Sequence, residues 1–149
     1  MTIHRIFQRL SPSSQQEEAA DAPAESEQVI ARQHYESSLR ESEEKYRRLF
    51  EASRDAIMIL YPPNWNFIAC NPATVELFGA RDEAHFTSLG PGEVSPEYQP
   101  DGESSMVKAP KAIHAAMRDG FHLFEWMHKR VGGANFLATV QLTRITLQG

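Results

Sequence analysis

Few of the features that stabilise small secreted or metal-binding domains occur in this chain. Its 149 residues contain one cysteine, Cys70, so neither a disulfide framework nor a cysteine-rich zinc site can form within one chain. We predict no metal site. Long apolar runs are also missing, because the most apolar stretch, Ala56–Tyr61, is far shorter than the roughly 20 residues needed to span a bilayer.

Basic charge and an apolar leader are missing too. The net charge is −5, which argues against nucleic acid as the main partner. The first residues include Arg5 and Arg9 but no continuous apolar stretch, so we expect no secretory signal. These absences and the single thiol predict a cytoplasmic location and no membrane contact within this segment.

Residues 11–28 contain no lysine, arginine or aromatic residue, and five acidic ones. Such a segment cannot bury enough apolar area to offset the entropy lost on ordering. We therefore predict a disordered acidic linker over residues 1–26. Its first ten residues are expected to be a frayed terminus, the alternative being a short amphipathic turn.

Residues 27–53 consist mainly of good helix formers without glycine or proline, which predicts a long helix. Leu39 and Tyr46 are seven residues apart, but the heptad pattern fades upstream. We predict a signalling and dimerisation helix that uses Ile30, Leu39 and Tyr46. The alternative is a helix that packs only at its C-terminal end.

A hairpin and a capped helix follow. The apolar run 56–61 and the run 66–70 are separated by a short turn, which predicts two paired strands. Asn71 is a good N-cap, Pro72 suits the first helical position, and Gly79 ends the helix.

Two more helices are expected before the chain returns to strands. One covers residues 81–89, and a glycine- and proline-rich loop follows over 90–102. The next helix begins at residue 104 or 105 and ends at Asp119. Pro110 lies inside it, so we expect a kink there or a start at Lys111.

Two long alternating segments, residues 121–131 and 135–147, complete the pattern. Phe124, Trp126 and His128 share one face of the first segment. Alternation of this length predicts antiparallel strands. The predicted fold class is α+β, with an antiparallel sheet, short helices on one of its faces and a preceding N-terminal helix.

Several of these segments together resemble a PAS sensor domain of the bacterial signal-transduction type. The resemblance is carried by residues Glu44–Glu51 with Asp55–Ile57, Phe67–Ala73 with Leu77–Gly79, Ser95–Gly102, and Phe124–Arg130. It covers about residues 41–149 and implies a PAS domain over residues 54–149.

The resemblance implies a sheet of five strands, but the pattern supplies four. The family's last strand lies centrally, between the first and the penultimate strand, and would begin just after Gly149. We therefore expect a domain truncated at its C-terminus, with two unpaired edges in the middle of the sheet.

PAS domains bind haem, flavin or small metabolites, or bind nothing and only dimerise. Trp126 and Phe124 are the best candidates for stacking on a planar ligand, although simple packing in the core is favoured for both. His114, Asn71 and Met58 complete the predicted ligand-binding set, although a helix cap is favoured for Asn71 and a surface or core-edge position for His114.

The resemblance places a haem ligand near residues 104–106, about two turns before His114. It places a photoreactive cysteine in a helical Asn-Cys-Arg-Phe-type motif, whereas Cys70 lies in a strand. The cofactor is therefore unknown: none or a small metabolite is favoured over haem or flavin.

No catalytic motif accompanies these residues, so we predict no enzyme activity in this segment. The resemblance implies a signal-input module of a histidine kinase or of a cyclic-di-nucleotide signalling enzyme. It would sense a ligand or dimerise, and relay the change through flanking helices to an effector located C-terminally. We expect a homodimer; the alternative function is a haem- or flavin-binding redox or gas sensor.

Overall fold

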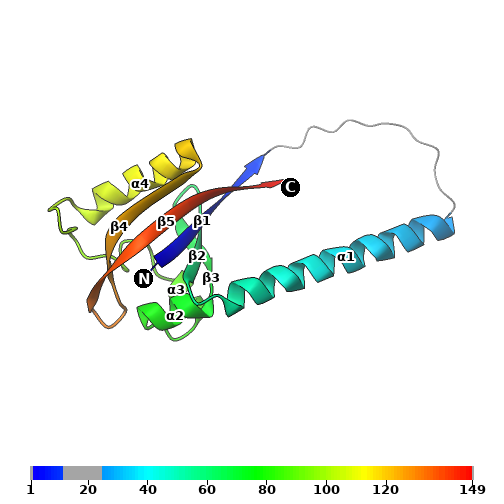
Figure 1. The fold of residues 1–149 in the computed structure, drawn as a ribbon, viewed down its shortest axis with the longest axis horizontal. Coiled ribbons are helices and arrows are strands. Elements are labelled where there is room, and N and C mark those ends of the chain that lie inside the picture. Colours follow the sequence, from blue (N-terminus) through cyan, green and yellow to red (C-terminus); the bar gives the residue numbers. More distant parts are fainter. Residues whose placement is uncertain (1, 12–24, 149) are drawn as a thin grey trace.

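The computed structural model describes residues 2–11 and 25–148. They form one five-stranded sheet with the strand order β3-β2-β1-β5-β4, and short helices cover one face of it (Figure 1). The elements are β1 Thr2–Ser11, α1 Glu25–Ala52, β2 Ala56–Tyr61, β3 Asn66–Cys70, α2 Pro72–Phe78, α3 Glu83–Thr87, α4 Ser105–Asp119, β4 Phe121–Lys129 and β5 Asn135–Gln148.

Both predicted strand pairs are present and antiparallel. β2 pairs with β3, and β4 pairs with β5 in a register that places Trp126 opposite Ala138. Helix α2 packs against β2, α3 against β3, and α4 against β4 and β5. The predicted α+β class, with helices on one face of the sheet and a long preceding helix, is confirmed.

The centre of the sheet differs from the prediction. Residues 2–11 form strand β1, which fills the position between β2 and β5 and runs parallel to both. The predicted frayed terminus, amphipathic turn and pair of open central edges are therefore wrong. Unpaired edges of β2 and β5 would leave backbone groups unsatisfied, and an extended ten-residue segment satisfies them. Of the predicted linker, residues 12–24 lie outside the described residues, and residues 25 and 26 belong to α1.

The helix termini follow the sequence closely. The Asn71 side chain caps α2, Pro72 is its first residue, and Gly79 ends it with a left-handed φ of 69°. Helix α3 is shorter than predicted because Asp82 caps it, accepting a hydrogen bond from the His85 amide at 2.7 Å.

Helix α4 starts at Ser105 and passes through Pro110, so the alternative start at Lys111 is wrong. Proline has no N–H for the carbonyl of residue 106, one turn earlier. Met106 is 73% exposed, so water can reach that carbonyl and the missing bond is tolerated.

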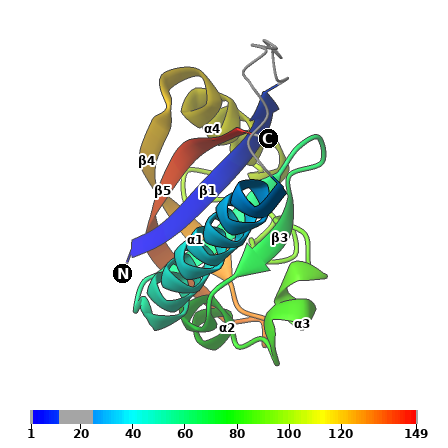
Figure 2. The same cartoon turned by 90° about the vertical axis from the view of Figure 1, so that its right-hand side faces the viewer.

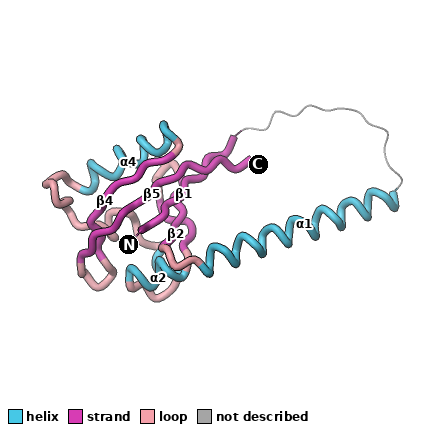
Figure 3. The backbone as a smooth tube through the Cα atoms, in the orientation of Figure 1, coloured by secondary structure: helices cyan, strands magenta, loops and turns pink. Residues whose placement is uncertain are grey.

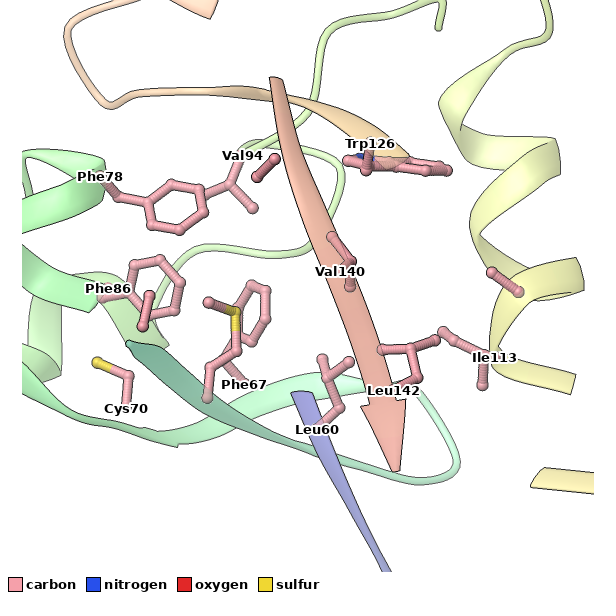
Figure 4. Packing of buried hydrophobic residues seen from close by; sticks show 14 of the residues in the cluster. Leu60, Phe67, Cys70, Phe78, Phe86, Val94, Ile113, Trp126, Val140 and Leu142 are labelled. Atoms are coloured by element: carbon pink, nitrogen blue, oxygen red, sulfur yellow. The ribbon is translucent and has the colours of Figure 1, made fainter. Parts of the chain in front are cut away.

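The core lies between the sheet and the three short helices (Figure 4). Phe78 is at the centre of an aromatic cluster, with ring centroids 5.1 Å from Phe86, 5.3 Å from Phe136 and 5.2 Å from His128. Trp126 and His128 are buried as their shared strand face predicts, whereas Phe124 is half-buried.

Helix α1 extends away from this core (Figures 1 and 3). Every residue of α1 except the half-buried Phe50 is exposed, so the helix is attached to the domain at its C-terminal end. Within the described residues, no helix is both long and apolar enough to cross a membrane.

Candidate functional site

The joint between α1 and the domain is organised by one fully buried side chain, that of Asn71. Its amide nitrogen donates to the carbonyl oxygens of Phe50 at 3.1 Å and Asp55 at 2.9 Å. Its Oδ1 accepts from the backbone amides of Ile57 at 2.9 Å and Thr74 at 3.1 Å. One amide group therefore holds together the end of α1, the start of β2 and the first turn of α2.

Thr74 reinforces this arrangement. Its hydroxyl lies 2.9 Å from the Ile57 carbonyl oxygen and 2.9 Å from Asn71 Oδ1, and the residue is fully buried. A buried polar network with its groups paired is rigid, and it is sensitive to the loss of any member. The sequence predicted the helix cap at Asn71 but not its bonds to α1, because these depend on chain segments brought together by the fold.

A groove of about 540 Å³ opens beside this joint. It lies within the size range of small-molecule sites, roughly 300–1,000 Å³. Residues of α1 form one wall, and residues of β3, α2 and α3 form the rest. The lining residues are Arg47, Phe50, Glu51, Cys70, Pro72, Val75, Glu76 and Glu83.

The groove is lined in part by Cys70, whose environment makes the thiol unreactive. Burial raises the pKa of Cys70 to about 12, and the nearby Glu83 carboxylate adds to the effect. Glu83 also accepts a hydrogen bond from the Cys70 amide at 3.0 Å. A neutral thiol in this position acts as a small apolar side chain.

The interior site predicted around Trp126 and Phe124 is largely filled by protein. The two rings lie edge to face, with centroids 5.9 Å apart, and the cavities that they border measure about 10 and about 240 Å³. Met58 is fully buried in the core. The predicted ligand contacts of these three residues remain predictions, and the available volume favours their role in packing.

The remaining candidates are separated from that cluster. His114 is exposed on α4, and Asn71 belongs to the α1 joint. Among the described residues, no group of histidine, cysteine, aspartate and glutamate side chains could hold a metal ion. The structure thus divides the predicted ligand set between the core, the joint and the surface.

A second set of polar contacts, not predicted from the sequence, fixes the loop between α3 and α4. Gln99 is buried; its side chain accepts from the Met127 amide at 2.9 Å and donates to Ser105 Oγ at 2.8 Å. The Trp126 indole donates to Ser95 Oγ at 3.1 Å. These contacts tie the loop to β4 and to the start of α4, and so close the domain over its core.

Comparison with known proteins agrees with this architecture. A family model described as a PAS domain matches residues 44–113. A solved PAS domain from a two-component sensor histidine kinase superposes with a TM-score of 0.52 at 18% identity, covering 69% of this chain and 83% of that one.

A further solved structure, a domain of the sensory box sensor histidine kinase/response regulator from Geobacter sulfurreducens, is 22% identical. The match covers 66% of this chain and 80% of that one, with a TM-score of 0.49. No curated protein matches the chain. The family match over residues 44–113, together with the fold, supports a PAS sensor domain in this chain.

Proposed function

We propose that this chain is a signal-input module of a bacterial sensory protein, such as a histidine kinase or a cyclic-di-nucleotide signalling enzyme. The domain would bias the position of α1, and α1 would relay that bias in a homodimer. The observation that carries the proposal is the Asn71 joint, because it makes the path of α1 depend on the geometry of β2 and α2.

The groove beside the joint supports a ligand-dependent mechanism. Arg47 and Glu51 of α1 and Glu76 of α2 line the same space, so a small molecule seated there would contact both parts. A ligand shifts a conformational equilibrium only if it binds one arrangement more tightly than the other. A site lined by both α1 and α2 changes shape when α1 moves, so a ligand would bind the two arrangements with different affinities.

Exposed apolar residues on α1 support dimerisation. Tyr35, Leu39, Tyr46 and Leu49 are 48–71% exposed, and their spacing places them along one side of the helix. Ile30 precedes Leu39 by nine residues and so lies on the opposite side. The proposed contact surface is therefore Tyr35, Leu39, Tyr46 and Leu49, without Ile30.

Charge along this stripe is compatible with two parallel copies. In a parallel pair of helices, Glu43 would face Ser38 of the second copy, and Phe50 would face Lys45. No two like charges meet at these flanking positions. A parallel pair also places both domains at the same end of the helices, as a shared output requires.

Light scattering of the full chain tests the proposal with a matched pair of variants. Leu39→Glu introduces a charge within the stripe, whereas Ser37→Glu introduces the same charge on the other side of α1. We expect a dimer for the wild type and for Ser37→Glu, and a monomer for Leu39→Glu. A monomeric wild type, or identical masses for the two variants, contradicts dimerisation through α1.

A further inference from the structure

Strand β4 lies at one side of the sheet, so only one of its two edges is paired with another strand. β5 is its neighbour on the inner side, and no strand of the described residues lies on its outer side (Figure 2). The backbone amides of Met127 and Lys129 donate outside the sheet, to Gln99 Oε1 and to the Val94 carbonyl oxygen, each at 2.9 Å. The odd-numbered residues of β4 therefore direct their backbone groups away from β5, because these directions alternate along a strand.

The same alternation leaves a short stretch of the outer edge open at Leu123 and Glu125. Their backbone N–H and C=O groups point away from β5, and within the described part of the chain they have no hydrogen-bond partner. Both residues are exposed. A row of free donors and acceptors at this spacing is the feature by which a sheet edge binds an extended backbone.

Gln99 shows how this edge binds an amide group. Its Oε1 accepts from the Met127 amide at 2.9 Å, and its Nε2 donates to the Met127 carbonyl oxygen at 3.1 Å. One side-chain amide thus satisfies both backbone groups of Met127, as a residue of an antiparallel neighbouring strand does. Gln99 also closes the edge at this position, so the open stretch ends before Met127.

A groove of about 240 Å³ accompanies the open edge on the face of β4 that α4 covers. Phe124 and Trp126 of β4 and Ala112 of α4 line it, together with the ion pair between Lys111 and Glu103. No described residue of β5 contributes to the lining, so the groove lies on the outer side of β4. Its volume is below the roughly 300–1,000 Å³ of small-molecule sites, and its aromatic lining suits one large apolar side chain.

The side chains of the open stretch define which residues a partner strand would need. Leu123 is 53% exposed, and Glu125 carries an exposed carboxylate on the same face. Directly opposite residues of an antiparallel pair interact, and opposite charges are favoured there. A branched apolar residue is therefore expected opposite Leu123 and a basic residue opposite Glu125. The residue between these two would direct its side chain to the other face, into the groove.

We propose that the outer edge of β4 binds an extended segment of a partner protein as an added antiparallel strand. In the direction of the partner chain, the segment carries a basic residue opposite Glu125, a large apolar residue for the groove and a branched apolar residue opposite Leu123. This inference goes beyond the signal-input proposal and does not depend on it, because neither α1 nor the Asn71 joint takes part.

Amide hydrogen exchange of the full chain tests the proposal with the capped peptide Lys-Phe-Val-Thr-Val. A saturating amount should slow exchange of the Leu123 and Glu125 amides at least tenfold and leave the Leu39 amide of α1 unchanged. The matched peptide Lys-Phe-Pro-Thr-Val lacks the N–H that would donate to the Leu123 carbonyl oxygen. We expect it to bind at least tenfold more weakly.

A charge exchange provides the second arm. Glu125→Lys should weaken binding of Lys-Phe-Val-Thr-Val by about two- to fivefold and strengthen binding of Glu-Phe-Val-Thr-Val by a similar factor. Glu43→Lys, the same change on an exposed position of α1, should alter neither.

Three results would overturn the proposal. The first is unchanged exchange at Leu123 and Glu125 with the peptide at millimolar concentration, and the second is equal binding of the valine and proline peptides. The third is protection of these two amides in the chain alone that increases with chain concentration, because it would assign the edge to a second copy. Equal affinities of Glu125→Lys and Glu43→Lys for the two charged peptides would overturn the predicted basic residue.

Discussion

Helices α1 and α4 both carry apolar residues at helical spacing, but they use them differently. Ala112, Ile113 and Ala116 of α4 are at most 8% exposed and pack against β4 and β5. The large apolar side chains of α1 that precede Phe50 are at least 48% exposed. α4 is therefore part of the domain's core, whereas the apolar side of α1 is available to a second copy.

The difference in burial gives the largest expected contrast between variants. Ile113→Ala should lower the free energy of unfolding by about 2–5 kcal/mol, because it leaves a cavity in the core. Leu39→Ala should change it by less than about 0.5 kcal/mol when measured on monomers. Urea unfolding at micromolar concentration checks both values. Equal losses would show that α1 packs on the domain.

Asn71→Asp tests the hydrogen bonds that attach the C-terminal end of α1 to the domain. Aspartate keeps an acceptor for the α2 cap but loses the donation to the Phe50 and Asp55 carbonyl oxygens. We expect a loss of about 1–3 kcal/mol, since a carboxylate oxygen would face the two carbonyl oxygens to which the Asn71 amide nitrogen donates. Urea unfolding measures this loss.

The matched control is Asp82→Asn, which changes the cap of α3 and keeps its acceptor oxygen. Its expected change is within about 0.5 kcal/mol. A loss at residue 82 as large as that at residue 71 would argue against a special role for the joint.

The raised pKa of Cys70 predicts that the stability of the chain falls at alkaline pH. The pKa of Cys70 is about 12 in the folded chain against an ordinary value of 9.0, so from pH 9 upward the unfolded state loses this proton first. Wild-type stability should fall more steeply than that of Cys70→Ala, by up to about 1.4 kcal/mol per pH unit. Parallel urea titrations of the two proteins between pH 8 and 11 check the slope, and identical slopes would contradict the burial of this thiol.

The smallest effect is expected on the exposed surface of α1. Arg48 and Glu44 form an ion pair at 3.4 Å, with both side chains mostly exposed. Arg48→Ala should change stability by about 0.3–0.5 kcal/mol, and high salt should abolish the difference. A loss above about 1 kcal/mol would indicate that this side of α1 packs against the domain.

Local patterns predicted most of the fold. Alternation and turn residues gave both hairpins, and Asn71, Pro72 and Gly79 gave the limits of α2. These features depend on neighbouring residues, which a single sequence displays. The resemblance to PAS domains then supplied the arrangement of the sheet.

Long-range contacts were not predictable in the same way. Residues 2–11 have Arg5 between Ile3 and Phe7, so the sequence of β1 lacks the regular alternation that predicts a strand. Gln99 and Ser95 lie in a glycine- and proline-rich loop, and their partners are about 30 positions away. Two residues of the predicted ligand set, Asn71 and His114, lie in different parts of the domain, and this separation depends on the fold and not on a local pattern.

Hydrogen exchange along α1 tests the central claim that this helix is held at one end by Asn71. In the monomeric Leu39→Glu chain, protection should be highest near Phe50 and decline towards Glu25. Adding Asn71→Asp should remove the protection near Phe50 while β4 and β5 keep theirs. Uniform protection along α1, or an unchanged pattern after Asn71→Asp, would contradict the account.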